Sequence, residues 1–264
     1  MIITVQGGLS AGHRMGGGLP TFLGLGVQKG GTTTLQKLLE QHPDVFLPPA
    51  KELHYFSLHY ARGEDWYRQQ FALAGSEKRI GEITPYYLFH PAAPGRIHAL
   101  LPQARLVVLL RDPVERALSQ YFHSRRLGLE TLELEEALEA EPQRLADAEV
   151  VLEADDGRHL SHQEHSYLSR SRYGEQLQRL ETLFPKEQLL VLRSEDLFEH
   201  PVPIWSRVLE FLELETWPLP LLKKPANAGG GEAAAVQPWL RQRLRQQLEP
   251  TYGWVANHYG LHWT

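Results

Sequence analysis

The chain has 264 residues, 42% of them hydrophobic and 22% charged, and a formal net charge of −5 at pH 7. These values are typical of a globular α/β protein and give no basic surplus for nucleic acid, and the apolar stretches are too short for a membrane span. The absence of cysteine excludes disulfides, cysteine-based zinc sites and a cysteine nucleophile.

Residues 1–18 contain six glycines and lack the basic start of a signal peptide. We therefore expect a flexible leader over residues 1–18 and a single domain over residues 19–264. The lack of export features favours a cytoplasmic, bacterial protein.

The first expected strand, Thr21–Val27, leads into a helix predicted over Thr32–Gln41. The connection contains Lys29, Gly30, Gly31, Thr32 and Thr33. Glycines let backbone N–H groups approach an anion, and the helix N-terminus, a lysine and two hydroxyls add to the attraction. The pattern predicts a phosphate-binding loop, although an ordinary glycine-rich turn is the alternative. In a Walker A loop the lysine follows the glycines, whereas Lys29 precedes them.

The next segment that contains candidate catalytic side chains is Pro49–Phe56. If it is extended, Glu52 and His54 point the same way. Apolar neighbours would raise the pKa of the carboxyl group, which suits a general base. The alternative is an ordinary surface glutamate.

Two further strands are predicted at Arg79–Ile83 and Arg105–Leu110, and the second precedes a helix over Pro113–Arg126. Arg111 follows the strand at its carboxyl end, where ligands bind in open α/β sheets. Ser119 lies about two turns into the helix. Both side chains are therefore candidates for one phosphate, against the alternative of a structural arginine and a surface serine.

The acidic segment Thr131–Glu141 is expected to be a solvated helix face. Pro142–Ser169 has a looser pattern and is interpreted as a lid or a substrate-facing insertion. The histidines at 159, 162 and 165 are three residues apart, so on one helix their side chains would point in progressively different directions. This arrangement suits zinc poorly, and we expect no metal site there. Arg241, Arg243 and Arg245 are interpreted as a solvated basic face.

The remaining predicted elements continue the alternation of strands and helices. They are helices at Tyr173–Phe184, Val202–Leu212 and Pro238–Leu248, a strand at Gln188–Leu192 and a flexible loop at Ala226–Ala235. This alternation of strands and helices is typical of βαβ units. We expect an α/β, P-loop-like three-layer fold with a central parallel sheet flanked by helices.

Three motifs, in this order, resemble the PAPS-dependent sulfotransferase family (PAPS is 3′-phosphoadenosine 5′-phosphosulfate). Lys29–Thr33 resembles the 5′-phosphosulfate loop, and Arg111 with Ser119 resembles the 3′-phosphate motif. Glu52-Leu-His54-Tyr-Phe56 resembles the catalytic segment of the heparan-sulfate-type 3-O-sulfotransferases. Within the family, the chain is most similar to the heparan-sulfate-type N- and 3-O-enzymes and their bacterial relatives.

The resemblance implies a role for each candidate. PAPS would be the co-substrate, 3′-phosphoadenosine 5′-phosphate (PAP) the product, and no metal would be required. Glu52 would be the general base, supported by His54, although the main base could be either residue. Lys29 would stabilise the leaving group. The donor-binding residues would be Lys29, Gly30, Gly31, Thr32, Thr33, Arg111 and Ser119, with Tyr173 nearby.

Two departures bear on the acceptor. Ile83 stands where heparan-type enzymes usually carry a lysine, and the loop Ala226–Glu232 is neither basic nor disulfide-tied. Both argue against a polyanionic acceptor, so we expect a hydroxyl, less readily an amine, of a carbohydrate or of a lipid-like or carrier-bound molecule. The alternatives are a P-loop kinase or NTPase, in which Asp112 would imitate Walker B, and a non-catalytic nucleotide-binding module.

Overall fold

The computed structural model describes residues 18–221 and 231–263. The leader expected over residues 1–18 therefore lies outside the described residues except for Gly18, and so do residues 226–230 of the expected loop. Residues Glu232–Ala235 of that loop form a short 3₁₀ helix.

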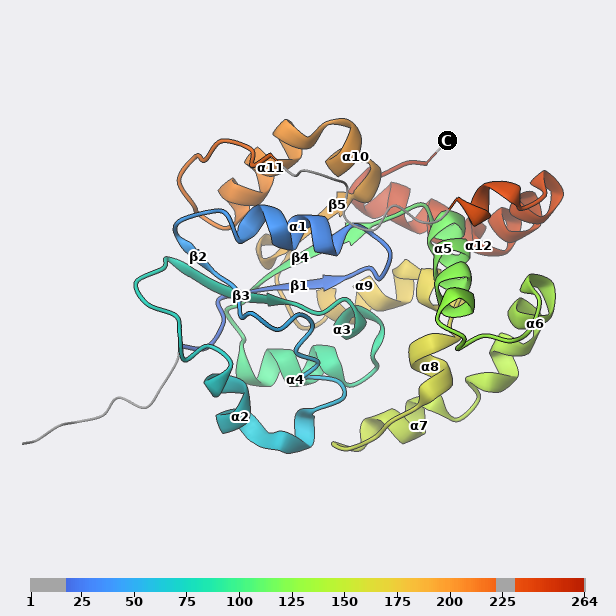
Figure 1. The fold of residues 1–264 in the computed structure, drawn as a ribbon, viewed down its shortest axis with the longest axis horizontal. Helices are drawn as coiled ribbons and strands as arrows, with labels where there is room; N and C mark the ends of the chain where they lie inside the picture. The colour runs from blue at the N-terminus through green and yellow to red at the C-terminus, as the bar shows by residue number, and fades with distance from the viewer. Residues whose placement is uncertain (1–17, 222–230, 264) are drawn as a thin grey trace, which may run out of the picture.

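Five parallel strands form the central sheet in the order β2-β3-β1-β4-β5 (Figure 1). They are β1 (Phe22–Gly26), β2 (Val45–Phe46), β3 (Arg79–Ile83), β4 (Arg105–Leu110) and β5 (Leu189–Arg193). Because all five strands are parallel, their carboxyl ends share one edge of the sheet, and the connections that carry the candidate residues begin there.

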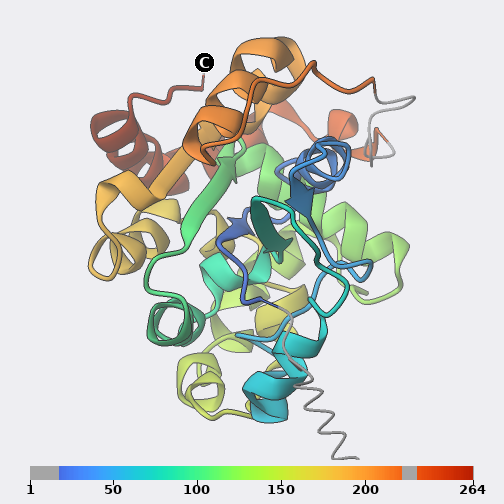
Figure 2. The same ribbon diagram turned by 90° about the vertical axis from the view of Figure 1, so that its left-hand side faces the viewer.

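Helices cover both faces of the sheet (Figure 1, Figure 2). One face carries α1 (Thr32–Leu39), α10 (Ser194–Glu199) and α11 (Pro201–Phe211). The other face packs with α2 (Gly63–Gln69), α3 (Tyr86–Phe89), α4 (Ala93–Leu100), α5 (Pro113–Arg126), α9 (Tyr173–Glu181) and α12 (Pro238–Tyr259). The result is the expected three-layer α/β architecture.

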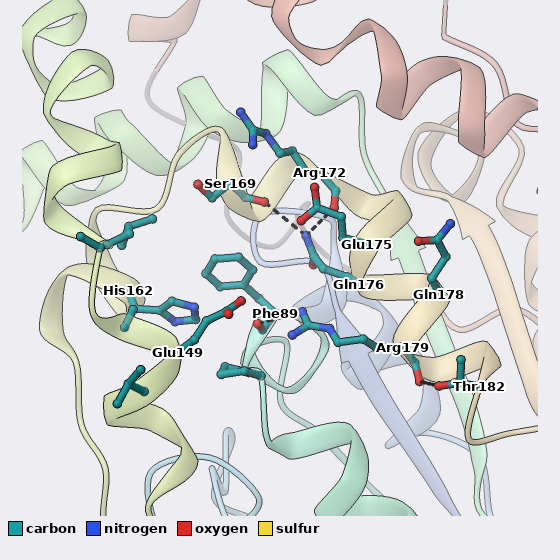
Figure 3. A pocket seen from close by; sticks show the side chains of 15 residues that line it. Phe89, Glu149, His162, Ser169, Arg172, Glu175, Gln176, Gln178, Arg179 and Thr182 are labelled. Carbon is teal, nitrogen blue, oxygen red and sulfur yellow. Dashed lines mark hydrogen bonds between the residues drawn. The ribbon is translucent and has the colours of Figure 1, made fainter.

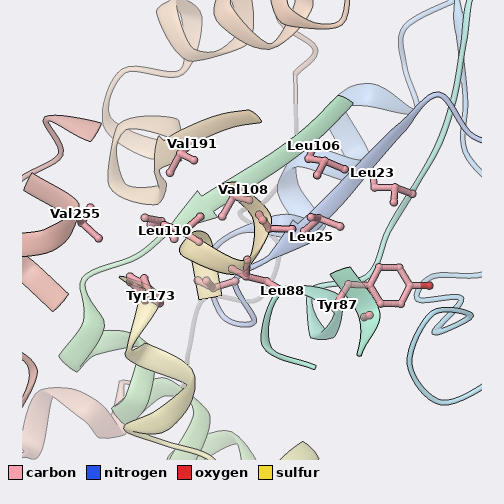
Figure 4. Packing of buried hydrophobic residues seen from close by; sticks show 14 of the residues in the cluster. Leu23, Leu25, Tyr87, Leu88, Leu106, Val108, Leu110, Tyr173, Val191 and Val255 are labelled. Atoms are coloured by element: carbon pink, nitrogen blue, oxygen red, sulfur yellow. The ribbon is translucent and has the colours of Figure 1, made fainter. Parts of the chain in front are cut away.

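The strands divide their side chains between two hydrophobic clusters. In β4, Leu106, Val108 and Leu110 join the cluster that contains α9 and α12, whereas Val107 and Leu109 join the cluster that contains α1 and α11. Figure 4 shows the first cluster, with strand side chains pointing at Tyr173 and neighbouring helical residues. Successive side chains of a strand point to opposite faces, so one buried strand serves two cores.

The predicted bounds of β3, β4 and α5 are confirmed, and the other predicted strands differ by a residue or two. The predicted end of the last helix at Leu248 is wrong, because α12 continues through Pro250 to Tyr259. Its later turns remain anchored, since Tyr252 and Val255 are buried and the Tyr252 hydroxyl donates to Asp112 Oδ2 at 3.0 Å.

The segment after α5 is helical and well packed. It comprises α6 (Leu134–Arg144), α7 (Ala148–Glu153) and α8 (Leu160–Glu164). A solvated acidic face was expected over Thr131–Glu141. This holds for most of the glutamates in that range but is wrong for Glu141, which is buried. Its carboxylate accepts the N–H groups of Leu168 and Ser169 at 2.8 and 2.7 Å, which fixes the chain just before Arg170.

The arginines of α12 are partly exposed, in line with the interpretation as a solvated basic face, and they also form ion pairs. Arg241 pairs with Glu115 of α5, and Arg243 lies 3.6 Å from Glu139 of α6. Arg245 lies 3.9 Å from Asp112. These pairs connect α12 to the elements on either side of it.

Candidate active site

The loop after β1 is a compact turn held by the neighbouring strand. The Val27 N–H donates to the Leu109 carbonyl at 2.8 Å, and the Gly30 N–H donates to the Val27 carbonyl at 2.9 Å. A Cβ atom on Gly30 would lie only 2.7 Å from the Leu109 carbonyl oxygen, so the close approach requires glycine. Gly31 has a φ of 87° and directly precedes α1. The loop therefore ends at a helix N-terminus, as the sequence predicts.

Positive charge gathers at this loop. Arg111 Nη1 donates to the Lys29 carbonyl at 3.2 Å, so the two predicted anion-binding residues lie together. Burial lowers the pKa of Lys29, and the charges of Arg126 and Arg111 lower it further. Within the described ranges, neither Lys29 nor Arg111 has a carboxylate within 4.0 Å. Cations without a negative partner favour an anionic ligand.

Tyr173 and Ser119 occupy different positions around Arg111. Tyr173 is fully buried, and its hydroxyl donates to the Arg111 carbonyl at 2.8 Å. It therefore supports the backbone at the end of β4 and would act on a nucleotide through Arg111. Ser119 is partly exposed on α5, the helix that starts beside Arg111.

Two residues that the sequence reasoning missed, His123 and Arg126, share a face of α5 with Ser119. They lie four and seven residues beyond it, the spacing of a helix face. Burial lowers the pKa of His123, and the nearby charges of Lys29 and Arg126 lower it further. His123 and Arg126 therefore lie within electrostatic range of Lys29. Their spacing of four and seven residues from Ser119 could have indicated from the sequence that His123 and Arg126 share its helix face.

Glu52 and His54 form the second half of the site. His54 Nε2 lies 3.3 Å from Glu52 Oε2, and both side chains are partly accessible, at 20% for His54 and 31% for Glu52. The other ring nitrogen, Nδ1, lies 3.2 Å from Ser57 Oγ. When Nε2 carries the proton, the histidine donates to the carboxylate and leaves the second carboxylate oxygen free to accept a proton.

A buried carboxyl group that was not among the predicted residues lies beneath this segment. Glu82 accepts hydrogen bonds from Tyr67, Thr84 and Tyr87 at 2.7, 2.8 and 3.0 Å. Burial raises its pKa, against the opposing effect of these hydrogen bonds. Thr84 Oγ1 also lies 3.5 Å from the His54 backbone nitrogen, so the network supports the Glu52 segment from below. The sequence around Glu82, just before Thr84-Pro85, did not indicate that this carboxyl group supports the Glu52 segment.

The three spaced histidines face different partners. His162 is buried, and its Nδ1 lies 2.8 Å from the Tyr86 hydroxyl. His159 Nε2 lies 3.0 Å from Asp147 Oδ1, and His165 Nε2 lies 3.0 Å from the Leu129 carbonyl. Across residues 18–221 and 231–263, no group of three or more His, Cys, Asp or Glu side chains is placed to hold a metal ion.

A cavity of about 660 Å³ lies between α9 and the α7–α8 region (Figure 3). Glu149, His162 and Phe89 face Arg179 and Gln176 across it. Tyr86 connects this region to the candidate site, because its hydroxyl meets His162 and its ring lies 6.1 Å from that of His54. Part of the predicted insertion at Pro142–Ser169 therefore forms a cavity wall.

The loop with Lys29 follows β1, Arg111 follows the neighbouring strand β4, and the Glu52–His54 pair follows β2, all in a P-loop-like α/β fold. A family model described as "Sulfotransferase domain" matches residues 20–223, and the chain belongs to this family. The predicted family is thereby confirmed. A kinase or NTPase is correspondingly disfavoured.

Individual relatives agree with this assignment. The chain is 29% identical to mouse heparan sulfate glucosamine 3-O-sulfotransferase 3B1 over 251 residues, which are 89% of this chain and 60% of that protein. It is 43% identical over 109 residues to the membrane-associated sulfotransferase kil1 of Dictyostelium discoideum, covering 40% of this chain and 23% of the relative. The chain thus spans less than two thirds of the length of these curated relatives.

The crystal structure of a sulfotransferase from Alicyclobacillus acidocaldarius has a TM-score of 0.77 and 28% sequence identity to this chain. The match covers 91% of this chain and 95% of that structure. No helix among the described residues is both long and apolar enough to cross a membrane.

Proposed function

We propose that this chain transfers a sulfuryl group from PAPS to an acceptor hydroxyl, with an amine as the less favoured acceptor. The observation that carries the proposal is the meeting of Lys29 and Arg111. The hydrogen bond from the Arg111 guanidinium to the Lys29 carbonyl joins the end of β4 to the loop after β1, and neither cation has a carboxylate partner among the described residues. PAPS carries anionic groups at both the 3′ and 5′ positions of its ribose, which suits two cationic positions.

The residues would divide the work as follows. Lys29, the N–H groups of Gly31 to Thr33 and the threonine hydroxyls would hold the 5′-phosphosulfate. The Gly30 N–H, which the sequence pattern also assigned to this group, is bonded to the Val27 carbonyl at 2.9 Å, so Gly30 would shape the loop. Arg111 and Ser119 would bind the 3′-phosphate, with Tyr173 fixing the Arg111 backbone. This arrangement needs PAPS to lie along the carboxyl edge of the sheet.

Glu52 would act as the base for the transfer. The acceptor oxygen forms a bond to sulfur while the bond from sulfur to the bridging oxygen breaks, and the acceptor proton passes to Glu52. The negative charge left on the bridging oxygen, now part of PAP, is stabilised by Lys29. Such transfer depends on in-line positioning and charge compensation more than on covalent help. His54, 3.3 Å from the carboxylate, would orient it.

The acceptor is proposed to be a carbohydrate or a lipid-like or carrier-bound molecule of low charge. Ile83, at the position where the heparan-type pattern has lysine, is buried and packs close to Gly24, so it supplies no charge to an acceptor. The chain's net charge of −5 likewise offers little general attraction for a polyanion.

Isothermal calorimetry with PAP tests the donor site without knowledge of the acceptor. We expect wild type to bind PAP, and Arg111→Met to bind it roughly 10- to 100-fold more weakly because a charge-assisted hydrogen bond is lost. Arg207→Met, an exposed position on α11, is the matched control and should bind like wild type. Absence of PAP binding by wild type, or Mg²⁺-dependent ATP turnover, would overturn the proposal. PAP binding without ³⁵S transfer from labelled PAPS would favour the non-catalytic alternative.

A further inference from the structure

Lys51 lies at the phosphosulfate loop, although it comes from a different segment of the chain. Its Nζ donates to Thr33 Oγ1 at 3.0 Å and lies 3.5 Å from Thr32 Oγ1. Both threonines belong to the first turn of α1, directly after the glycines. The segment Lys51–Glu52 thus crosses the N-terminus of α1.

The charge of Lys51 lacks a direct negative partner. Among the residues that the structure describes, no carboxylate lies within 4.0 Å of its ammonium group. Burial lowers its pKa, while the more distant carboxylates of Glu52 and Glu40 act in the opposite direction. The two hydroxyl groups accept hydrogen bonds but carry no charge, so they leave the ammonium uncompensated.

Two lysines therefore approach one helix N-terminus from separate segments. Lys29 comes from the loop itself, and Lys51 comes from the chain that carries Glu52. Thr32 and Thr33, the first two residues of α1, connect these positions. An anion bound at the N-terminus of α1 would therefore lie close to the Lys51 ammonium group and to the loop that carries Lys29.

We propose that Lys51 is a second cation of the phosphosulfate site and binds the 5′ end of the donor alongside Lys29. The inference rests on the proposed function, because it assigns a further residue to the same donor. It also gives the Lys51–Glu52 pair a combined role: neighbouring residues hold the donor anion and accept the acceptor proton. Donor binding and base position would thereby be coupled.

Calorimetry with two nucleotides can measure how strongly the protein recognises the 5′-phosphate. PAP carries both 3′- and 5′-phosphates, whereas 3′-AMP lacks the 5′-phosphate, so the ratio of their dissociation constants measures recognition of that group. We expect Lys51→Met to reduce this ratio roughly tenfold or more and to leave 3′-AMP binding unchanged. Lys37→Met, an exposed lysine on the same helix, should retain the wild-type ratio.

Two further variants separate charge from support of the loop. Lys51→Arg keeps the charge and should retain most of the ratio, whereas Lys51→Gln keeps a donor for Thr33 without the charge and should lose it. A wild-type ratio in Lys51→Met, or full retention in Lys51→Gln, would overturn the inference. If wild-type protein does not bind PAP, the proposed function itself fails. A wild type that binds PAP while Lys51→Met keeps its ratio defeats only the role of Lys51.

Discussion

At the scale of single residues, the proposed roles of donor binding and proton transfer fall on separate pairs of residues. The Arg111 guanidinium donates to the Lys29 carbonyl at the sheet edge, whereas Glu52 and His54 pair with each other on a different segment. A substitution in the second pair can therefore alter the chemical step without removing a cation from the donor site.

Glu52→Gln is expected to lower kcat by roughly 10²- to 10⁴-fold, since it removes the proton acceptor and keeps the shape of the side chain. PAP affinity should stay at the wild-type level. Transfer of ³⁵S from labelled PAPS to an acceptor from cell extract gives the rate, and calorimetry gives the affinity.

His54→Asn is the informative comparison. An orienting histidine predicts a smaller loss of kcat than in Glu52→Gln, because the carboxylate remains. If Glu52→Gln keeps full labelling while His54→Asn abolishes it, the histidine is the base and the assignment of Glu52 is wrong.

At the scale of elements, a buried carboxylate holds the connection between α5 and α6. Glu130 accepts the N–H groups of Thr131 and Leu132 at 2.9 Å each, the Arg144 guanidinium at 2.6 Å and the Tyr167 hydroxyl at 2.7 Å. Burial acts to raise its pKa, but the hydrogen bonds from Arg144, Leu132 and Tyr167 lower it to about 2.

This low pKa predicts how stability depends on pH. A carboxyl group with a depressed folded-state pKa stabilises the fold above its unfolded pKa, near 4.3, and loses that contribution as pH falls toward about 2. Urea unfolding should therefore show that Glu130→Gln is roughly 2–3 kcal/mol less stable than wild type at pH 7. The difference should shrink between pH 4.5 and pH 2.

Glu133→Gln is the control, because Glu133 is exposed and its ion pair with Arg125 lies at the surface. Such pairs contribute little, so its stability should stay within about 0.5 kcal/mol of wild type. A difference between Glu130→Gln and wild type that does not change from pH 7 to pH 2.5 would contradict the assigned ionisation.

Local pattern was enough to predict the elements that position the site. A run of apolar residues with a polar turn after it gave β4, and Asp112 followed by Pro113 gave the start of α5, where Asp112 caps the Glu115 N–H at 2.9 Å. Because parallel strands end at one edge, Lys29 and Arg111 could be expected to meet.

What the sequence could not supply came from tertiary packing. Pro250 breaks the helical hydrogen-bond pattern, so the prediction ended the helix, yet Tyr252 and Val255 are buried and α12 continues. Lys51 and Glu82 gave no signal because their partners, Thr33 and Tyr67, are set by the fold. Short elements such as α3 lack enough residues for a periodic pattern.

At the scale of the whole molecule, the two cores share the strands that position the site. Val107 and Leu109 of β4 pack with α1 and α11, while Val108 packs on the opposite face with α9 and α12. Neither core can lose β4 without disturbing the other. We therefore propose that residues 19–264 unfold as one cooperative unit.

Leu109→Ala tests this proposal from one face. Deleting a fully buried leucine side chain should cost about 2–5 kcal/mol. In denaturant-dependent hydrogen exchange, amides of α1, on the same face, and of α9, on the other, should lose protection by the same free energy, because both open through the same global transition. Leu221→Ala, at a position 94% exposed, should change neither. Loss of protection confined to α1 would instead show that the two faces of the sheet open separately. The loop between β1 and α1 would then belong to a less stable folding unit than the one that contains Arg111.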